Sequence, residues 1–155
     1  MKPLSKHLDR LIFLAGFIVA LSALLTVFSY DTESLAGYEV IAGVELYDVD
    51  PFDLGSVASA HLPFSFIGLA AFGLPLAGGV LVLMEKRYVF ITAALFIVGV
   101  VMFVLLRDST DIVYTVAGFE RSESVDWNLE AGYYLGFTVS LIGALLSIVE
   151  LMKKR

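Results

Sequence analysis

Four long apolar runs constrain the fold of this 155-residue chain more than any other feature. Each approaches the roughly 20 residues that a helix needs to cross a hydrocarbon core of about 30 Å. They cover about residues 11–30, 63–84, 88–106 and 132–152. The chain is 59% hydrophobic, whereas soluble domains are roughly 45–50% apolar. The sequence therefore predicts an all-α membrane protein, a four-transmembrane-helix antiparallel bundle that forms a single domain over residues 1–155.

The first run follows a short basic segment with Lys2, Lys6 and Arg10. A basic start followed by apolar residues is also typical of a signal peptide that is later removed. Here the apolar run continues from Leu11 through Phe28, longer than the roughly 7–15 apolar residues of an ordinary signal peptide. We therefore expect a first helix that is retained in the protein.

Charge is distributed unevenly between the ends of the predicted spans. The two long loops, residues 31–62 and 107–131, carry thirteen acidic and two basic residues. The N-terminal segment, the Glu85–Arg87 turn and the C-terminal tail carry the other eight Lys and Arg. Because cytoplasmic loops are enriched in Lys and Arg, we expect a multi-pass protein of the cell membrane. Its termini would be cytoplasmic and both long loops extracellular.

Both long loops contain segments with strand character. The first has β-branched and aromatic residues between Tyr38 and Tyr47, and the second has them between Ile112 and Phe119. An isolated hairpin is marginal in water, so we expect the two segments to pair as one small antiparallel β cap over the helices. Separate irregular loops are the alternative. Residues 54–62 read as a short helix that leads into the second span.

Small residues and one proline mark the predicted helix contacts. Close packing of Gly and Ala brings membrane helices together, and Pro75 is expected to kink its helix. The sequence does not distinguish packing within one chain from packing between copies. The candidate packing and interaction residues are Gly16, Gly68, Gly73, Pro75, Gly136, Gly143, Tyr38, Tyr47, Tyr114 and Phe119.

Few residues suggest a metal or catalytic site. Asp48, Asp50 and Asp53 are a candidate Ca²⁺ cluster because Ca²⁺ prefers oxygen ligands, although the twelve-residue calcium-loop pattern is missing. A solvated acidic turn is the alternative. The chain has no cysteine, and His7 and His61 fall on opposite sides of the predicted membrane. Without a nucleophile beside a base, or a nucleotide-binding motif, we expect neither an enzyme nor a cofactor.

The predicted layout resembles the plan of claudin-type proteins, which have four spans, inward termini and a larger first outer loop with strand character. The likeness covers the whole chain but is one of topology. The claudin-type signature, a tryptophan motif followed by two cysteines in the first loop, is absent, since Trp127 lies in the second loop. The resemblance therefore implies an architecture and assigns no functional residue.

These features favour a structural or assembly role, in which the protein self-associates in the membrane and makes contacts through its acidic cap. The expected partners are membrane lipid and further copies or other membrane proteins, and the acidic cap is expected to repel nucleic acid. The alternative is an accessory subunit of a larger membrane complex, or a small channel or transporter subunit. The spans lack Lys, Arg, Asp and His at mid-depth, which argues against a proton-coupled transporter.

Overall fold

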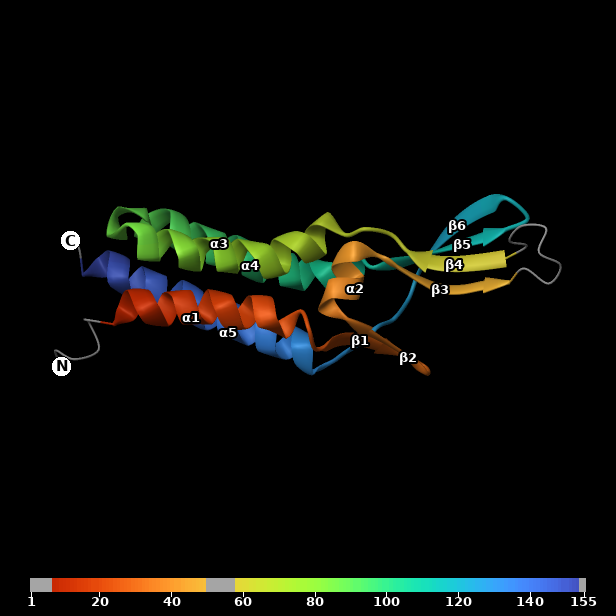
Figure 1. The fold of residues 1–155 in the computed structure, drawn as a ribbon, viewed down its shortest axis with the longest axis horizontal. Helices are drawn as coiled ribbons and strands as arrows, with labels where there is room; N and C mark the ends of the chain where they lie inside the picture. The colour runs from red at the N-terminus through yellow and green to blue at the C-terminus, as the bar shows by residue number, and fades with distance from the viewer. Residues whose placement is uncertain (1–6, 50–57, 154–155) are drawn as a thin grey trace.

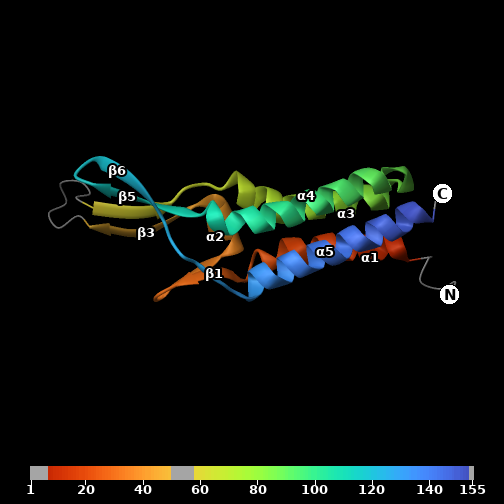
Figure 2. The same cartoon turned by 180° about the vertical axis from the view of Figure 1, so that it is seen from behind.

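The computed structural model describes residues 7–49 and 58–153. Long helices occupy one end of the elongated molecule and two antiparallel sheets occupy the other (Figure 1). The long helices are α1 (Leu8–Ser22), α3 (Phe66–Met84), α4 (Val89–Asp108) and α5 (Ala131–Met152). Along the ring that they form, α3 contacts α1 and α4, and α5 contacts α4 and α1. The start of α1 and the end of α5 lie at the end far from the sheets (Figure 2).

The predicted all-α fold with four membrane-spanning helices is wrong. The described part of the chain holds five α-helices and seven strands, and only α3, α4 and α5 are long and apolar enough to cross a membrane. The first apolar run does not form one helix, because α1 ends at Ser22 after 15 residues. At 1.5 Å per residue its length is about 22 Å, short of the hydrocarbon thickness.

The end of that run forms a strand instead. β1 (Thr26–Tyr30) begins with the β-branched residues Thr26 and Val27, which favour extended backbone. It pairs with β2 (Glu33–Ala36) on one side and with β7 (Asn128–Leu129) on the other. Apolar character alone does not separate a buried strand from a helix, which explains the error.

A short helix, α2 (Gly37–Ala42), replaces the first half of the strand predicted over Tyr38–Tyr47. The carboxylate of Glu39 accepts a hydrogen bond from the backbone N–H of Ala36 at 2.8 Å and so satisfies a free donor at the start of the helix. Gly43 ends the helix with a φ of 81°, in the left-handed region that favours glycine. The first outer segment therefore turns before its strand begins.

The second sheet has four strands in the order β3-β4-β5-β6. They are β3 (Val44–Val49), β4 (Ala58–Leu62), β5 (Asp111–Val116) and β6 (Phe119–Ser124). β4 lies between β3 and β5, so the predicted direct pairing of the first strand with the Ile112–Phe119 segment is wrong. The part of the predicted helix 54–62 that the structure describes is strand β4.

The helices pack through glycine and proline contacts within one chain. Pro75 is buried in α3, between Gly16 of α1 and Gly99 of α4. A Cβ atom built on Gly99 would lie 2.6 Å from Cγ of Pro75. The Thr92 hydroxyl in α4 donates to the carbonyl of Gly78 in α3 at 3.0 Å, so a buried polar group is satisfied across this contact.

The largest buried side chains gather where the helices meet the sheets. Trp127 is 2% exposed and stacks on Phe28 with ring centroids 5.8 Å apart. Phe103 of α4 meets Phe72 of α3 at 4.8 Å and Tyr133 of α5 at 5.8 Å, both edge-on. This aromatic cluster joins the three apolar helices to β1 and fixes the base from which the four-stranded sheet projects.

Candidate interaction surface

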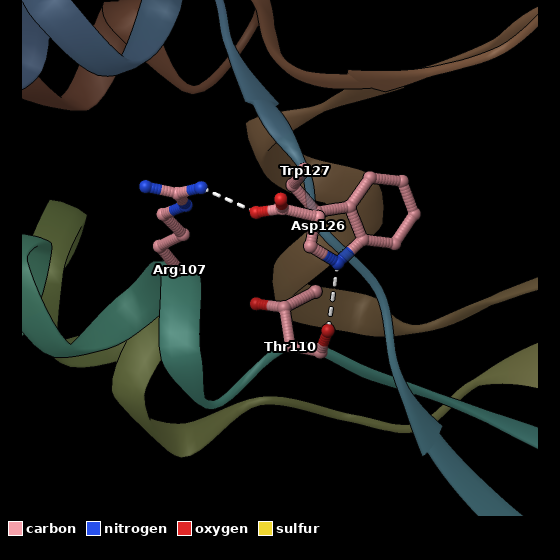
Figure 3. A network of polar contacts seen from close by, with 4 residues as sticks. All are labelled: Arg107, Thr110, Asp126 and Trp127. Carbon is pink, nitrogen blue, oxygen red and sulfur yellow. Dashed lines mark hydrogen bonds and ion pairs between the residues drawn. The ribbon is translucent and has the colours of Figure 1, made fainter.

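The four-stranded sheet is attached to the helices through the end of α4, because β5 begins three residues after the helix ends. The Thr110 hydroxyl donates to the carbonyl of Leu106 at 2.6 Å, and the indole N–H of Trp127 donates to the carbonyl of Thr110 at 2.7 Å. Arg107 pairs with Asp126 at 2.5 Å (Figure 3). These bonds hold the chain that enters the β5–β6 hairpin against the chain that leaves it.

One face of this sheet is mainly apolar, apart from Arg121 and Glu123 on its last strand, and the other is mainly polar. Residues that pair across antiparallel strands point to the same side. The register places Tyr47, Ala60, Tyr114 and Arg121 in one row, and Val116 faces Phe119 on the same side. The opposite face carries a more polar set, namely Glu45, His61, Asp48, Ser59, Val113, Thr115, Glu120 and Ser122.

Burial of the apolar face falls along the strands. Ala60, Leu62 and Ile112 are buried near the helix ends and belong to the aromatic core. Val116 is 54% exposed and Phe119 is 81% exposed at the far end. Exposed apolar side chains grouped at one place mark an interaction surface more often than single exposed residues do.

Tyrosines gather on the same face. Ala60 lies between Tyr47 and Tyr114 in the row, and its small side chain leaves room for both rings. Partial burial raises the pKa of Tyr114 above its ordinary value of 10, and Glu123, Tyr47 and Tyr30 raise it further. Tyr114 therefore stays protonated, as a hydrogen-bond donor, well above neutral pH.

The two edges of the sheet differ in how well they are protected. β3 has a register shift between Glu45 and Tyr47, and irregular edges of this kind discourage pairing with another chain. β6 pairs with β5 over all six of its residues in continuous register. All six residues of β6 are exposed, so its outer edge is open. The edge strand and the adjoining exposed apolar residues Val116 and Phe119 are called the β6 surface below.

A tight turn fixes the geometry of β6. Ala117 and Gly118 connect β5 to β6 with φ values of 50° and 81°. Two positive φ values in a two-residue connection are typical of a type I′ hairpin turn, whose twist matches that of the strands. The hairpin is therefore regular in register, and β6 runs back from the tip of the sheet toward the helices (Figure 1).

The sequence-predicted packing residues take several positions. Gly16, Gly68, Pro75, Gly136 and Gly143 are buried inside the chain. Gly136 and Gly143 of α5 lie against the rings of Phe103 and Phe96, and Gly68 lies near Ile41 of α2. Gly73 has open space where a Cβ would be. Packing within one chain thus accounts for five of these six residues.

The predicted interaction residues divide between two places. Tyr47, Tyr114 and Phe119 share the apolar face of the four-stranded sheet, whereas Tyr38 lies apart on α2 and is 53% exposed. Asp48 is exposed on the polar face, and Asp50 and Asp53 lie outside the described residues. Among residues 7–49 and 58–153, no group of three His, Cys, Asp or Glu side chains is placed to hold a metal ion.

Two hollows lie at the junction of sheets and helices. One of about 260 Å³ is lined mainly by apolar residues at the start of α3, including Phe64 and Phe66. The other, of about 460 Å³, is lined by Arg107, Asp126 and neighbouring polar residues. Asp111 borders both. The Arg107–Asp126 ion pair is exposed to solvent, and such pairs contribute less than about 1 kcal/mol to stability.

Sequence reasoning missed most of the β6 surface. In the segment Phe119–Ser124 only Phe119 is apolar. The segment therefore does not show the apolar alternation of a half-buried strand. A signal was nevertheless present, because Ala117-Gly118 follows the apolar strand Ile112–Val116 and glycine is typical of hairpin turns. The returning strand could have been inferred from that turn.

Comparisons with protein families, with curated proteins and with solved structures find no match for this chain. They therefore give no support to the claudin-type resemblance. The function is argued below from the geometry of the chain itself.

Proposed function

We propose that this is a multi-pass membrane protein with a structural or assembly role, and that it self-associates through the β6 surface. The observation that carries the proposal is an open six-residue strand edge beside exposed apolar residues. Open edges present unpaired N–H and C=O groups that pair readily with another strand. β6 lacks proline, lysine and a bulge, which commonly protect edges, and its charged residues are Glu120, Arg121 and Glu123.

The membrane part of the proposal rests on apolar side chains that face outward. α3, α4 and α5 meet the length and hydropathy expected of membrane spans. Large apolar side chains on the outside of these helices are exposed, among them Phe66 at 77%, Phe90 at 68% and Leu145 at 61%. Water would not favour so much exposed apolar surface, whereas lipid would.

The orientation follows from charge. Arg10, Arg87 and Lys153 lie near the ends of helices at the pole opposite the sheets, and Arg87 pairs with Glu85 there. The positive-inside rule then favours a cytoplasmic location for the Glu85–Arg87 turn and for the end of α5, with the two sheets and α2 outside the cell. Below, the two sheets and α2 together are called the β unit.

Single cysteines test this orientation, because the chain has none of its own. Ser34 is exposed on β2, and Glu85 is exposed at the opposite pole. We expect Ser34→Cys to react with a membrane-impermeant maleimide in intact cells, and Glu85→Cys to react only after permeabilisation. Labelling of Glu85→Cys in intact cells, with Ser34→Cys protected, would show the opposite orientation.

Blocking one backbone donor tests self-association. Val116 and Phe119 form the closing, hydrogen-bonded pair of the β5–β6 hairpin. Because hydrogen-bonded and non-hydrogen-bonded pairs alternate along antiparallel strands, the N–H of Ser122 points away from β5. Proline is tolerated at such edge positions, so Ser122→Pro should keep the hairpin but remove a bond to a second chain. In sedimentation of the detergent-solubilised protein, we expect wild type to be dimeric and Ser122→Pro to be monomeric with an unchanged Tm.

Ser122→Thr is the matched control, because threonine keeps the backbone donor and favours extended backbone. We expect this variant to associate as wild type does. Equal association of wild type and Ser122→Pro would contradict a role for the β6 edge, and a wild type that is monomeric in both detergent and vesicles would contradict self-association itself.

A further inference from the structure

The alternation of hydrogen bonds along β6 decides which of its groups are free. Val116 and Phe119 close the two-residue turn, and such a closing pair exchanges hydrogen bonds across the hairpin. Bonding to β5 therefore recurs at every second residue, at Phe119, Arg121 and Glu123. The backbone groups of Glu120, Ser122 and Ser124 point outward, where all three residues are exposed.

We propose that β6 pairs antiparallel with β6 of a second copy, with Ser122 opposite Ser122 on a two-fold axis, and that the two copies lie in facing membranes. This proposal rests on the proposed function and specifies its partner and geometry. Glu120 then faces Ser124 of the other copy, and the outward groups form about six hydrogen bonds in three residue pairs. Two four-stranded sheets become one continuous sheet of eight strands.

Charge selects this register over its neighbours. Only outward-directed residues can bond, so the register changes in steps of two residues. With Ser122 on the axis, Arg121 faces Glu123 of the other copy in both directions, and opposite charges on facing strands are favourable. A shift of two residues places Arg121 opposite Arg121 or Glu123 opposite Glu123. A shift of four places Glu120 opposite Glu120 in one direction; in the other it pairs only Ser124 with Ser124 within β6 and leaves Arg121 and Glu123 without partners on β6.

Apolar contacts at the ends of the paired strands agree with the same register. Continuing the pairing by one step beyond β6 places Phe119 opposite Val125 of the second copy, on the same face as Arg121. Phe119 is 81% exposed in the single chain, and Val125 is half-buried beside the core. Pairing would cover the most exposed aromatic ring of the four-stranded sheet at both ends of the interface.

The direction of β6 places the two copies in separate membranes. β6 runs along the long axis of the molecule, as the helices do (Figures 1 and 2). An antiparallel partner therefore has its long axis reversed, and its helices extend away from the shared sheet in the opposite direction. Two copies in the same membrane share one orientation of this axis and would bring their β6 strands together in parallel.

The acidic charge of the two β units opposes their approach over long distances. At physiological ionic strength the Debye length is about 8 Å, so charges farther apart than this interact weakly. The Arg121–Glu123 pairs lie well within that distance when the strands are bonded. The contact is therefore expected at physiological salt, where long-range repulsion is screened.

A cysteine scan of β6 tests the register. Paired residues across a hydrogen-bonded site have Cα atoms about 5.5 Å apart, within the usual range of about 4.4–6.8 Å for a disulfide. We expect Ser122→Cys, reconstituted in vesicles at about 0.15 M salt, to form disulfide-linked dimers on mild oxidation. Glu120→Cys and Ser124→Cys should each give no disulfide-linked dimer alone and should cross-link when mixed. Dimers of Arg121→Cys or Glu123→Cys alone would instead identify a shifted register and overturn this one.

Two vesicle populations test the facing-membrane arrangement. One population carries Ser122→Cys with a short tag and the other carries it with a longer tag. After mixing and oxidation we expect dimers that join one short-tagged chain to one long-tagged chain, because the disulfide forms between vesicles. Dimers that join only chains with the same tag would overturn the arrangement.

Charge reversal separates failure of this proposal from failure of the proposed function. Arg121→Glu and Glu123→Arg in the Ser122→Cys background should each reduce cross-linking at least fivefold, and the double variant should restore it. If sedimentation still shows association through β6 while the cysteine at position 122 never cross-links, this geometry is wrong and self-association stands. If the protein does not associate at all, the proposed function fails as well.

Discussion

Replacing Phe103 with alanine should lower the free energy of unfolding by about 3–5 kcal/mol, the range for removing a buried aromatic side chain. Phe103 is fully buried, and its ring meets Phe72 and Tyr133 edge-on. The side chains around the resulting cavity belong to three helices, which limits how far they can collapse into it. Aromatic pairs of this geometry add to the loss beyond the buried area alone.

The measurement is reversible unfolding in mixed micelles, followed by tryptophan fluorescence. Trp127 is the single tryptophan of the chain and lies in the same aromatic cluster, so its emission reports on this junction. Phe90→Ala is the matched control, because Phe90 is on the same helix but is 68% exposed. Similar losses for the two variants would contradict the view that the cluster holds the helices to the sheets.

The sequence predicts long apolar helices well where one run is long enough to leave no alternative. The runs over 63–84, 88–106 and 132–152 agree to within a few residues with α3, α4 and α5. A run of about 20 apolar residues exceeds the length of ordinary strands, so it is a helix wherever it forms a single element. The first run failed because it joins a 15-residue helix to a five-residue strand of similar hydropathy.

The outer elements could not be predicted in the same way, because local and distant interactions compete there. Tyr38 to Ala42 has strand-forming residues, but the carboxylate of Glu39 and the turn at Gly43 favour a helix. Residues 58–62 are small and look helical, yet they become a central strand between partners far away in the sequence. Such pairing is a tertiary effect that overrides propensity.

The candidate surface was predictable only in part, for a related reason. Exposed apolar residues such as Tyr47 and Phe119 are visible in the sequence, but which strand lies at an edge depends on the order of strands in the sheet. The sequence shows the charges of Arg121 and Glu123, but only the strand register shows which residues they face. The packing role of the glycines could not be predicted either, since the sequence does not show what each glycine contacts.

Alanine at two glycines should therefore give opposite results. A Cβ on Gly16 of α1 would collide with the backbone carbonyl of Pro75 in α3, and would lie 3.2 Å from Cα of Leu76. Backbone cannot move aside as a flexible side chain can, and overpacking of this kind costs about 1–3 kcal/mol. We expect Gly16→Ala to lower the free energy of unfolding by that amount and to separate α1 from α3.

Gly73→Ala is the matched substitution, because Gly73 lies in the middle of α3 with no atom within 4 Å of a built Cβ. Alanine favours helix by up to about 1 kcal/mol over glycine, so this variant should be neutral or slightly stabilised. Unfolding in mixed micelles gives both values, and sedimentation gives the association of each variant. A destabilised or monomeric Gly73→Ala would show that this face packs against another copy, whereas wild-type association confines glycine packing to the interior of one chain.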